Sequence, residues 1–120
     1  MDAEMLTGNI VVLLSNLFCS ITFVAISIWA RKRTTPMHFY SGTSIDPRTV
    51  SDIPAYNKAN AKMWMIFSIP FMLSLVLNLL AFFIPMLFVV SVILVALDCT
   101  AGIAWLMIEY NRIAKEFIIR

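Results

Sequence analysis

The feature that most constrains this chain is a pair of long apolar stretches. Residues 9–30 carry no charged side chain, and residues 63–108 carry only one, Asp98. About 20 apolar residues suffice for a helix to cross the hydrocarbon core of a bilayer. Of the 120 residues, 61% are hydrophobic and 13% are charged, whereas a soluble domain has about 25% charged residues. We therefore expect a single-domain, all-α integral membrane protein whose main partner is the lipid bilayer.

The second apolar stretch is too long for one span. As a single helix, residues 63–108 would measure about 70 Å, far more than the thickness of a bilayer. Pro85 is the natural turn, so the spans are predicted at about 9–30, 63–84 and 86–108, with a tight hairpin at Pro85. Pro70 lies inside the second span and should kink it, because its ring removes a backbone hydrogen bond.

Two polar segments lie outside the predicted spans. Residues 31–62 form a loop that we expect on the cytoplasmic membrane surface, and residues 109–120 form a helical cytoplasmic tail. Within the loop, Ser44 or Asp46 can cap a short helix that begins at Pro47, since proline is favoured at the first helical position. Asp52 stands in front of a second helical start, at Pro54.

The distribution of charge predicts the orientation. All nine lysines and arginines fall in the loop or the tail, whereas the N-terminal end has Asp2 and Glu4. Cytoplasmic segments carry such an excess of bases, so we expect the N-terminus outside and the C-terminus in the cytoplasm. Tryptophan is enriched at membrane interfaces. Three tryptophans fall near the predicted cytoplasmic ends of the spans, which agrees with this orientation: Trp29, Trp64 and Trp105.

Each predicted span has one seam of small or polar residues at helical spacing. The seam residues are Asn9, Asn16, Ser20 and Ser27 in the first span, Ser74 and Asn78 in the second, and Ser91, Asp98 and Gly102 in the third. Such residues pack helices together in lipid, since amides and hydroxyls bond across helices. A bond between Asn16 and Asn78, within or between subunits, is one such prediction. We also expect Gly102 and Ala101 to permit close helix approach.

Asp98 is the one acid at membrane depth. An ionised carboxylate there costs about 2.5–3.5 kcal/mol on insertion scales, and no lysine, arginine or histidine lies inside a span to pair with it. It is therefore protonated, faces water, or meets a cation of a partner. Three roles stay open: a site of proton- or cation-coupled transport, a docking point, or a structural acid. In the structural role it would bond to Ser74, Ser20 or Thr22.

The loop also carries a resemblance to known proteins. Its strings PMHFYSG (36–42) and DIPAYNKAN (52–60), followed by Met63-Trp64, resemble a group of small bacterial three-span membrane proteins without an assigned activity. The resemblance covers about a third of the chain. It implies the same topology and a bacterial cytoplasmic membrane, and it implies no functional residues.

Several classes of function have no support in the residues. Cys19 and Cys99 lie inside apolar runs and are expected to be packed as small hydrophobic residues, and the lone His38 makes a poor metal site. No nucleophile-base pair is present, so we expect neither an enzyme nor a bound cofactor or metal. A net charge of +2 does not indicate nucleic acid as a partner.

Two functions remain. The first is an accessory or interaction subunit of a larger membrane assembly, including an immunity-type protein. It is favoured by the turn at Pro85, which has no polar side chain and offers a possible partner contact at Phe82, Phe83 and Met86. The alternative is a homo-oligomeric channel or transporter, in which Asp98 lines the pathway. Three helices are too few to enclose a pathway alone, so this function requires several copies of the chain.

Overall fold

The computed structural model is all-helical and elongated, measuring 57 × 23 × 21 Å along its principal axes. It describes residues 1–37 and 45–119. The elements in chain order are α1 (Ala3–Lys32), η1 (Pro47–Thr49), α2 (Ile53–Leu80), α3 (Met86–Leu97), η2 (Asp98–Gly102) and α4 (Ile103–Phe117). The last three follow one another without a break, so α3, η2 and α4 act as one long helix.

Three helices are long and apolar enough to cross a membrane: Ala3–Lys32, Ile53–Leu80 and Met86–Phe117. This confirms the predicted all-α, three-helix architecture. A helix of 30 residues such as α1 is about 45 Å long, which matches a whole bilayer including its headgroup layers.

The helices differ from the predicted spans mainly at their ends. α1 begins at Ala3 rather than residue 9, because Asp2 caps it by accepting a bond from the Met5 amide at 2.8 Å. Likewise α2 begins at Ile53, where Asp52 accepts from the Ala55 amide at 3.1 Å. Side-chain caps of this kind satisfy amides that lack a partner in the first turn. The start of α1 was therefore underestimated, whereas the start of α2 agrees with the helical start predicted at Pro54 after Asp52.

The turn begins earlier than predicted. α2 ends at Leu80, not residue 84, and α3 begins at Met86. The main chain of residues 81–85 stays hydrogen-bonded, since Phe83 and Ile84 both donate to the Leu80 carbonyl, at 3.0 and 2.9 Å. A turn without polar side chains thus satisfies part of its backbone internally.

The tail is shorter than predicted, because α4 ends at Phe117. The next residues are extended, and Ile118 pairs with Val50 as an isolated antiparallel bridge. Two bonds secure it: Ser51 donates to the Phe117 carbonyl at 2.8 Å, and Ile119 donates to the Thr49 carbonyl at 2.6 Å. The C-terminal end is thereby attached to the loop.

The loop is anchored on both sides of residues 38–44. As predicted for Asp46, its carboxylate caps η1 by accepting from the Arg48 amide at 3.0 Å. The alternative cap, Ser44, lies outside the described residues. Hydrogen bonds from the Arg48 side chain and amide hold the pKa of Asp46 below its usual range. On the N-terminal side of residues 38–44, Met37 is buried against the start of α2.

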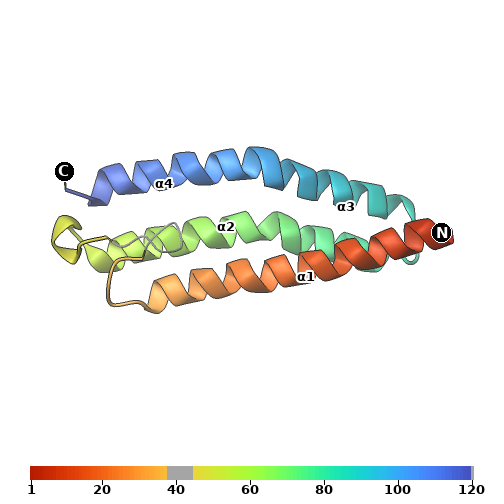
Figure 1. The fold of residues 1–120 in the computed structure, drawn as a ribbon, viewed down its shortest axis with the longest axis horizontal. Coiled ribbons are helices and arrows are strands. Elements are labelled where there is room, and N and C mark those ends of the chain that lie inside the picture. Colours follow the sequence, from red (N-terminus) through yellow and green to blue (C-terminus); the bar gives the residue numbers. More distant parts are fainter. Residues whose placement is uncertain (38–44, 120) are drawn as a thin grey trace.

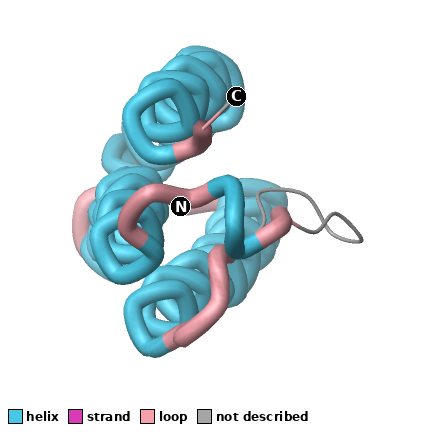
Figure 2. The backbone as a smooth tube through the Cα atoms, turned by 90° about the vertical axis from the view of Figure 1, so that its left-hand side faces the viewer, coloured by secondary structure: helices cyan, strands magenta, loops and turns pink. Residues whose placement is uncertain are grey.

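The three long helices lie in a row, with α2 in the middle (Figures 1 and 2). α1 packs along α2 on one side, and α3 with α4 packs on the other. α1 touches α3 at few places, one of which is Gly8 beside the ring of Phe88. Since α1 and the third helix barely meet, most of each faces the surroundings, which in a membrane is lipid.

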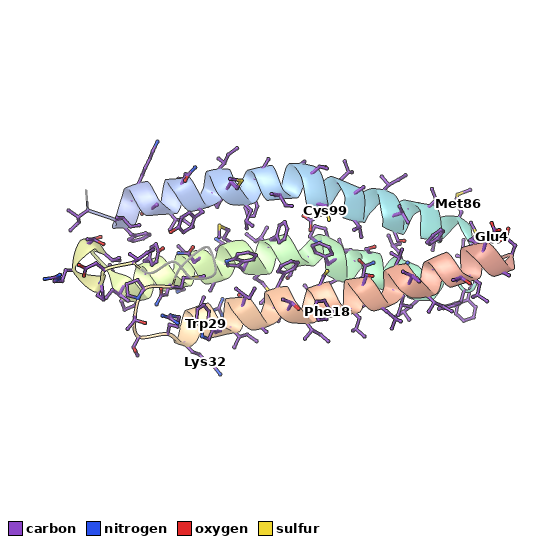
Figure 3. All side chains as sticks on the ribbon, in the orientation of Figure 1. Glu4, Phe18, Trp29, Lys32, Met86 and Cys99 are labelled. Carbon is purple, nitrogen blue, oxygen red and sulfur yellow. The ribbon has the colours of Figure 1, made fainter. Side chains whose placement is uncertain are left out.

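The two ends of the molecule along its long axis differ in charge. Glu4 and Met86 lie at one end, with the turn, whereas Trp29 and Lys32 lie at the other, with the loop and the C-terminus (Figure 3). Every described lysine and arginine falls at the loop end, in the last turn of α1, the loop, the early turns of α2 or the last turns of α4.

The apolar packing is mostly aromatic and joins α1 to α2. The ring of Phe23 lies 5.0 Å from that of Phe67, 5.3 Å from Phe71 and 5.7 Å from Trp64, measured between centroids. Of the cysteines, Cys19 is half-buried, but Cys99 is exposed. The expectation that both are packed was wrong for Cys99, because the third helix lacks a neighbour on that side.

Candidate functional site

The predicted seams meet between the helices. The buried residues of α1 are nearly the predicted set: Asn9, Asn16, Ser20, Ser27 and Ala30. Ser74 and Asn78 of α2 are buried as well, as are Ser91 of α3 and Asp98 of η2. Ser27 donates to the Ala61 carbonyl of α2 at 2.6 Å. The other polar side chains fall into two groups, because some form a network across helices and others have an oxygen without a partner.

The first group is a network in the turn half of the molecule, which we call the turn-half network: Asn9, Asn16, Ser74, Asn78 and Ser91. Asn78 is its centre. Its amide nitrogen donates to Asn9 Oδ1 at 2.9 Å and to Ser91 Oγ at 3.0 Å. Its oxygen accepts from Asn16 Nδ2 at 2.7 Å. The bond predicted between Asn16 and Asn78 is thus present, within one chain.

Ser74 completes the turn-half network one turn away. Its hydroxyl accepts from Asn16 Nδ2 at 2.7 Å and donates to the Ser91 carbonyl at 3.0 Å. Asn9 adds a bond from its amide to the Asn78 carbonyl at 3.0 Å. All five side chains are at most 1% exposed. Since they join α1, α2 and α3, the network holds the row together, and it has no group free for chemistry.

Asp98 lies outside this network, between the third helix and α2. It is 7% exposed, and its Oδ2 is buried without a hydrogen-bond partner. No hydrogen bond among the described residues joins it to Ser74, Ser20 or Thr22. Ser74 bonds to Ser91, and the Thr22 hydroxyl donates to the Phe18 carbonyl at 2.8 Å. The hydrogen bond that the structural role predicted, from Asp98 to one of these hydroxyls, is not present among the described residues.

The backbone is irregular on both sides of Asp98. Asp98 opens the π-helical turn η2, a feature often found at functional sites. Opposite it stands Pro70 of α2, which has no N–H to donate to the carbonyl of Ile66 four residues earlier. A cavity of about 180 Å³ lies between them, lined also by Leu94, Leu97 and Gly102. The site therefore pairs a carboxyl group with a small hollow between α2 and the third helix.

Gly102 permits the close approach at this site. A Cβ atom there would lie 3.3 Å from the ring of Phe67 and only 2.2 Å from Asp98 Oδ1. The absent side chain therefore makes room for the carboxyl group. Ala101, for which the same role was predicted, is exposed instead.

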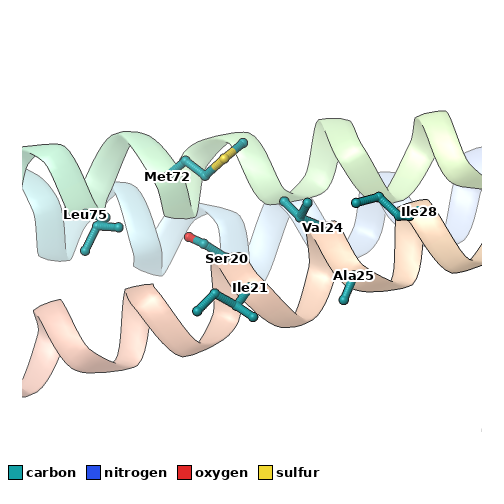
Figure 4. A pocket seen from close by; sticks show the side chains of 7 residues that line it. All are labelled: Ser20, Ile21, Val24, Ala25, Ile28, Met72 and Leu75. Carbon is teal, nitrogen blue, oxygen red and sulfur yellow. The ribbon is translucent and has the colours of Figure 1, made fainter.

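Ser20 is the second seam residue without a partner. The residue is only 6% exposed, and its hydroxyl is buried without a hydrogen-bond partner. It lines a groove of about 460 Å³ between α1 and α2 whose other walls are apolar. Figure 4 shows Ser20 pointing from α1 toward α2, where Met72 and Leu75 lie. We call this hollow the Ser20 groove.

The apolar side chains of the turn point outward. Phe83 is 84% exposed and Met86 is 74% exposed, and Phe82 is exposed as well. Ala81 is fully buried by contrast, so the turn is attached on one side and bare on the other.

Sequence reasoning missed a polar cluster at the loop end. The Asn57 amide accepts from the Met37 N–H at 2.8 Å and donates to the Thr35 carbonyl at 2.8 Å. The Tyr56 hydroxyl bonds to the Met37 carbonyl at 3.1 Å and lies 3.0 Å from that of Tyr110. The signal in the sequence was the pair Tyr56 and Asn57 just after the start of α2, since such side chains can bond to a neighbouring loop. The cluster positions the loop.

Neither metal-ligating residues nor similarity to known proteins indicates a further site. No group of three or more metal-ligating side chains occurs in residues 1–37 and 45–119, and His38 lies outside them. No family model, curated protein or solved structure matches the chain.

Proposed function

We propose that this chain is an accessory subunit that docks on a larger membrane protein, with one transmembrane helix of that protein lying in the Ser20 groove. The observation that carries the proposal is the open apolar groove of about 460 Å³ between α1 and α2, which is lined by apolar side chains and by Ser20. The Ser20 hydroxyl is itself buried within the chain, so the groove presents apolar surface to an occupant. Small residues such as Ser20 and Ala25 permit close approach of helices in lipid. The partner is thus a helix with an apolar face.

The row arrangement supports this function. α1 has α2 on one side and little contact with the third helix, so a helix can reach the groove without displacing part of the chain. The exposed turn offers a second contact for the same partner through Phe83 and Met86. An immunity-type role, in which the partner is a membrane-active protein that threatens the host, is one form of this function.

The proposal includes a topology. We place the N-terminus outside and the C-terminus in the cytoplasm of a bacterial cytoplasmic membrane, with Pro70 kinking α2. The gathering of the described bases at the loop end supports the orientation through the positive-inside rule. The resemblance of the loop to small bacterial three-span proteins supports the membrane.

Photo-crosslinking tests the docking. A photoreactive amino acid at Val24, in the groove, is compared with one at Ile93, which is exposed on α3. We expect Val24 alone to give an adduct with one different membrane protein. Filling the groove by Ala25→Trp should suppress this adduct, and Ala96→Trp, at an exposed alanine of α3, should not. Equal adducts from both positions, or an adduct that survives Ala25→Trp, contradict the proposal.

The turn contact has its own test. Replacing Phe83 and Met86 by serine should reduce the recovery of that same crosslinked partner while the three-span topology is retained. Recovery equal to that of the unmodified chain would remove the turn from the interface and leave the groove as the only contact.

A second candidate function is favoured by Asp98: proton- or cation-coupled transport by a homo-oligomer. Its support is the buried carboxyl oxygen without a partner beside the π-helical turn and the cavity at Pro70. Proton flux into liposomes, followed with a pH-sensitive dye, tests it. Asp98→Asn should abolish the flux, and Glu109→Gln should leave it intact. Absence of flux from the unmodified chain, or unchanged flux in Asp98→Asn, excludes this function.

A further inference from the structure

A hollow that neither function uses lies between the loop-end halves of α2 and α4. Its volume is about 370 Å³, and it is more enclosed than the Ser20 groove. Met63 and Ile66 of α2 and Trp105 of α4 provide its apolar part. Four charged side chains also line it: Lys62, Glu109, Arg112 and Glu116. We call it the loop-end hollow.

The charges of the hollow are balanced but incompletely paired. Arg112 forms ion pairs with Glu109 and, at 3.8 Å, with Glu116. Lys62 has no ion pair within the described part of the chain, and the Glu116 side chain is 58% exposed despite its ion pair. Around one cavity, α2 thus offers an unpaired cation and α4 offers an exposed carboxylate with room for a second partner. A purely anionic ligand would meet two carboxylates there, and a purely cationic one would meet two bases.

The depth of the hollow matches the headgroup layer. Trp105 marks the end of the third apolar stretch, and Glu116 lies eleven residues further along the helix, or about 16 Å. In the proposed topology, the apolar part of the hollow faces the hydrocarbon and the charged part faces water. Ile66, 41% exposed, forms an edge open to lipid. A ligand that enters from the membrane thus meets apolar walls first and charges beyond them.

We infer that the loop-end hollow binds a zwitterionic phospholipid with a primary ammonium headgroup, the phosphatidylethanolamine class. Its phosphate lies by Lys62 and its ammonium by Glu116, while the first carbons of its chains rest on Met63 and Trp105. A primary ammonium donates hydrogen bonds to a carboxylate, which a quaternary choline headgroup cannot do. Charge-assisted bonds of both signs would then select this headgroup.

Native mass spectrometry of the full chain released from lipid nanodiscs tests this inference. The nanodiscs contain equal amounts of phosphatidylethanolamine, phosphatidylcholine and phosphatidylglycerol. We expect one phosphatidylethanolamine to stay bound under activation that removes the other two. Lys62→Gln and Glu116→Gln should each lower its retention about fivefold, the effect of one favourable surface charge pair.

Matched variants give the control. Lys58→Gln and Lys115→Gln remove exposed bases of the same two helices that do not line the hollow, so retention should be unchanged. Glu116→Gln should also shift the preference toward phosphatidylglycerol, because the hollow then has excess positive charge. Equal retention of all three lipids, preference of the unmodified chain for phosphatidylglycerol, or equal losses in the control variants would overturn the inference.

Discussion

Buried polar side chains near the turn and those near the middle of the helices have different surroundings. In the turn-half network every one of the five side chains bonds across a helix interface. At Ser20 and Asp98, a buried oxygen has no partner. Both kinds of residue belong to the same helical seams. The comparison teaches that one polar seam can contain both residues that bond between helices and residues whose buried oxygens have no hydrogen-bond partner.

The two regions also differ in their backbone. The turn half has regular helices on either side of the network, whereas Asp98 lies in a π-helical turn opposite Pro70. Regular geometry brings Asn78 and Ser91 into register for bonding. The irregular geometry instead leaves a cavity beside the carboxyl group. Mutations in the two regions should therefore have different consequences.

The largest effect is expected from Asn78→Leu, which removes the centre of the turn-half network. Three side-chain bonds are lost, to Asn9, Asn16 and Ser91. Bonds of this kind in a membrane average about 0.6 kcal/mol, so we expect a loss of about 2 kcal/mol in the free energy of unfolding. Unfolding in mixed micelles with increasing SDS, followed by circular dichroism, measures it. Asn111→Leu, on the exposed part of α4, should change stability little. A similar loss in both variants would refute the network's role.

A smaller effect is expected from Gly102→Ala. The added Cβ would meet Asp98 Oδ1 at 2.2 Å, and overpacking costs about 1–3 kcal/mol. Alanine regains about 1 kcal/mol through its higher helix propensity, so the net loss is about 1 kcal/mol. Adding Asp98→Ala to Gly102→Ala should recover this loss, which a double-mutant cycle measures. If the changes in the free energy of unfolding from the two substitutions simply add, residue 102 and the Asp98 carboxyl group are not in contact.

The smallest effect on stability is expected from Asp98→Asn. The Oδ2 atom that it replaces makes no hydrogen bond, so the free energy of unfolding should change by less than about 1 kcal/mol, in contrast to Asn78→Leu. The same SDS titration measures both. A loss as large as that of Asn78→Leu would mean that Asp98 belongs to the structural group, and the distinction between the two regions would fail.

Residue spacing predicted the seams well, and it did so for a physical reason. A helix in lipid turns its few polar residues toward other helices, so Asn9, Asn16 and Ser20 at spacings of seven and four had to share a face. The bond between Asn16 and Asn78 was predicted from their similar depth along the two spans, and it is present. Spacing within each helix also located Asp98 on the inner face of the third one.

Other features depended on contacts that spacing within a helix does not determine. The order of the helices, with α2 in the middle, decides which seams meet, so the missing partner of Asp98 was not predictable. The bridge between Val50 and Ile118 joins segments 68 residues apart. The start of α1 was underestimated because Asp2 caps the helix ahead of its apolar residues, whereas the start of α2 after Asp52 was predicted.

The central claim is that the Ser20 groove holds a helix of another membrane protein. Native mass spectrometry after gentle extraction from the host membrane tests it most directly. We predict a stoichiometric complex of this chain with one different membrane protein, which Ala25→Trp dissociates and Ala96→Trp does not. A closed homo-oligomer without a second protein would contradict the claim and would favour the transport function of Asp98.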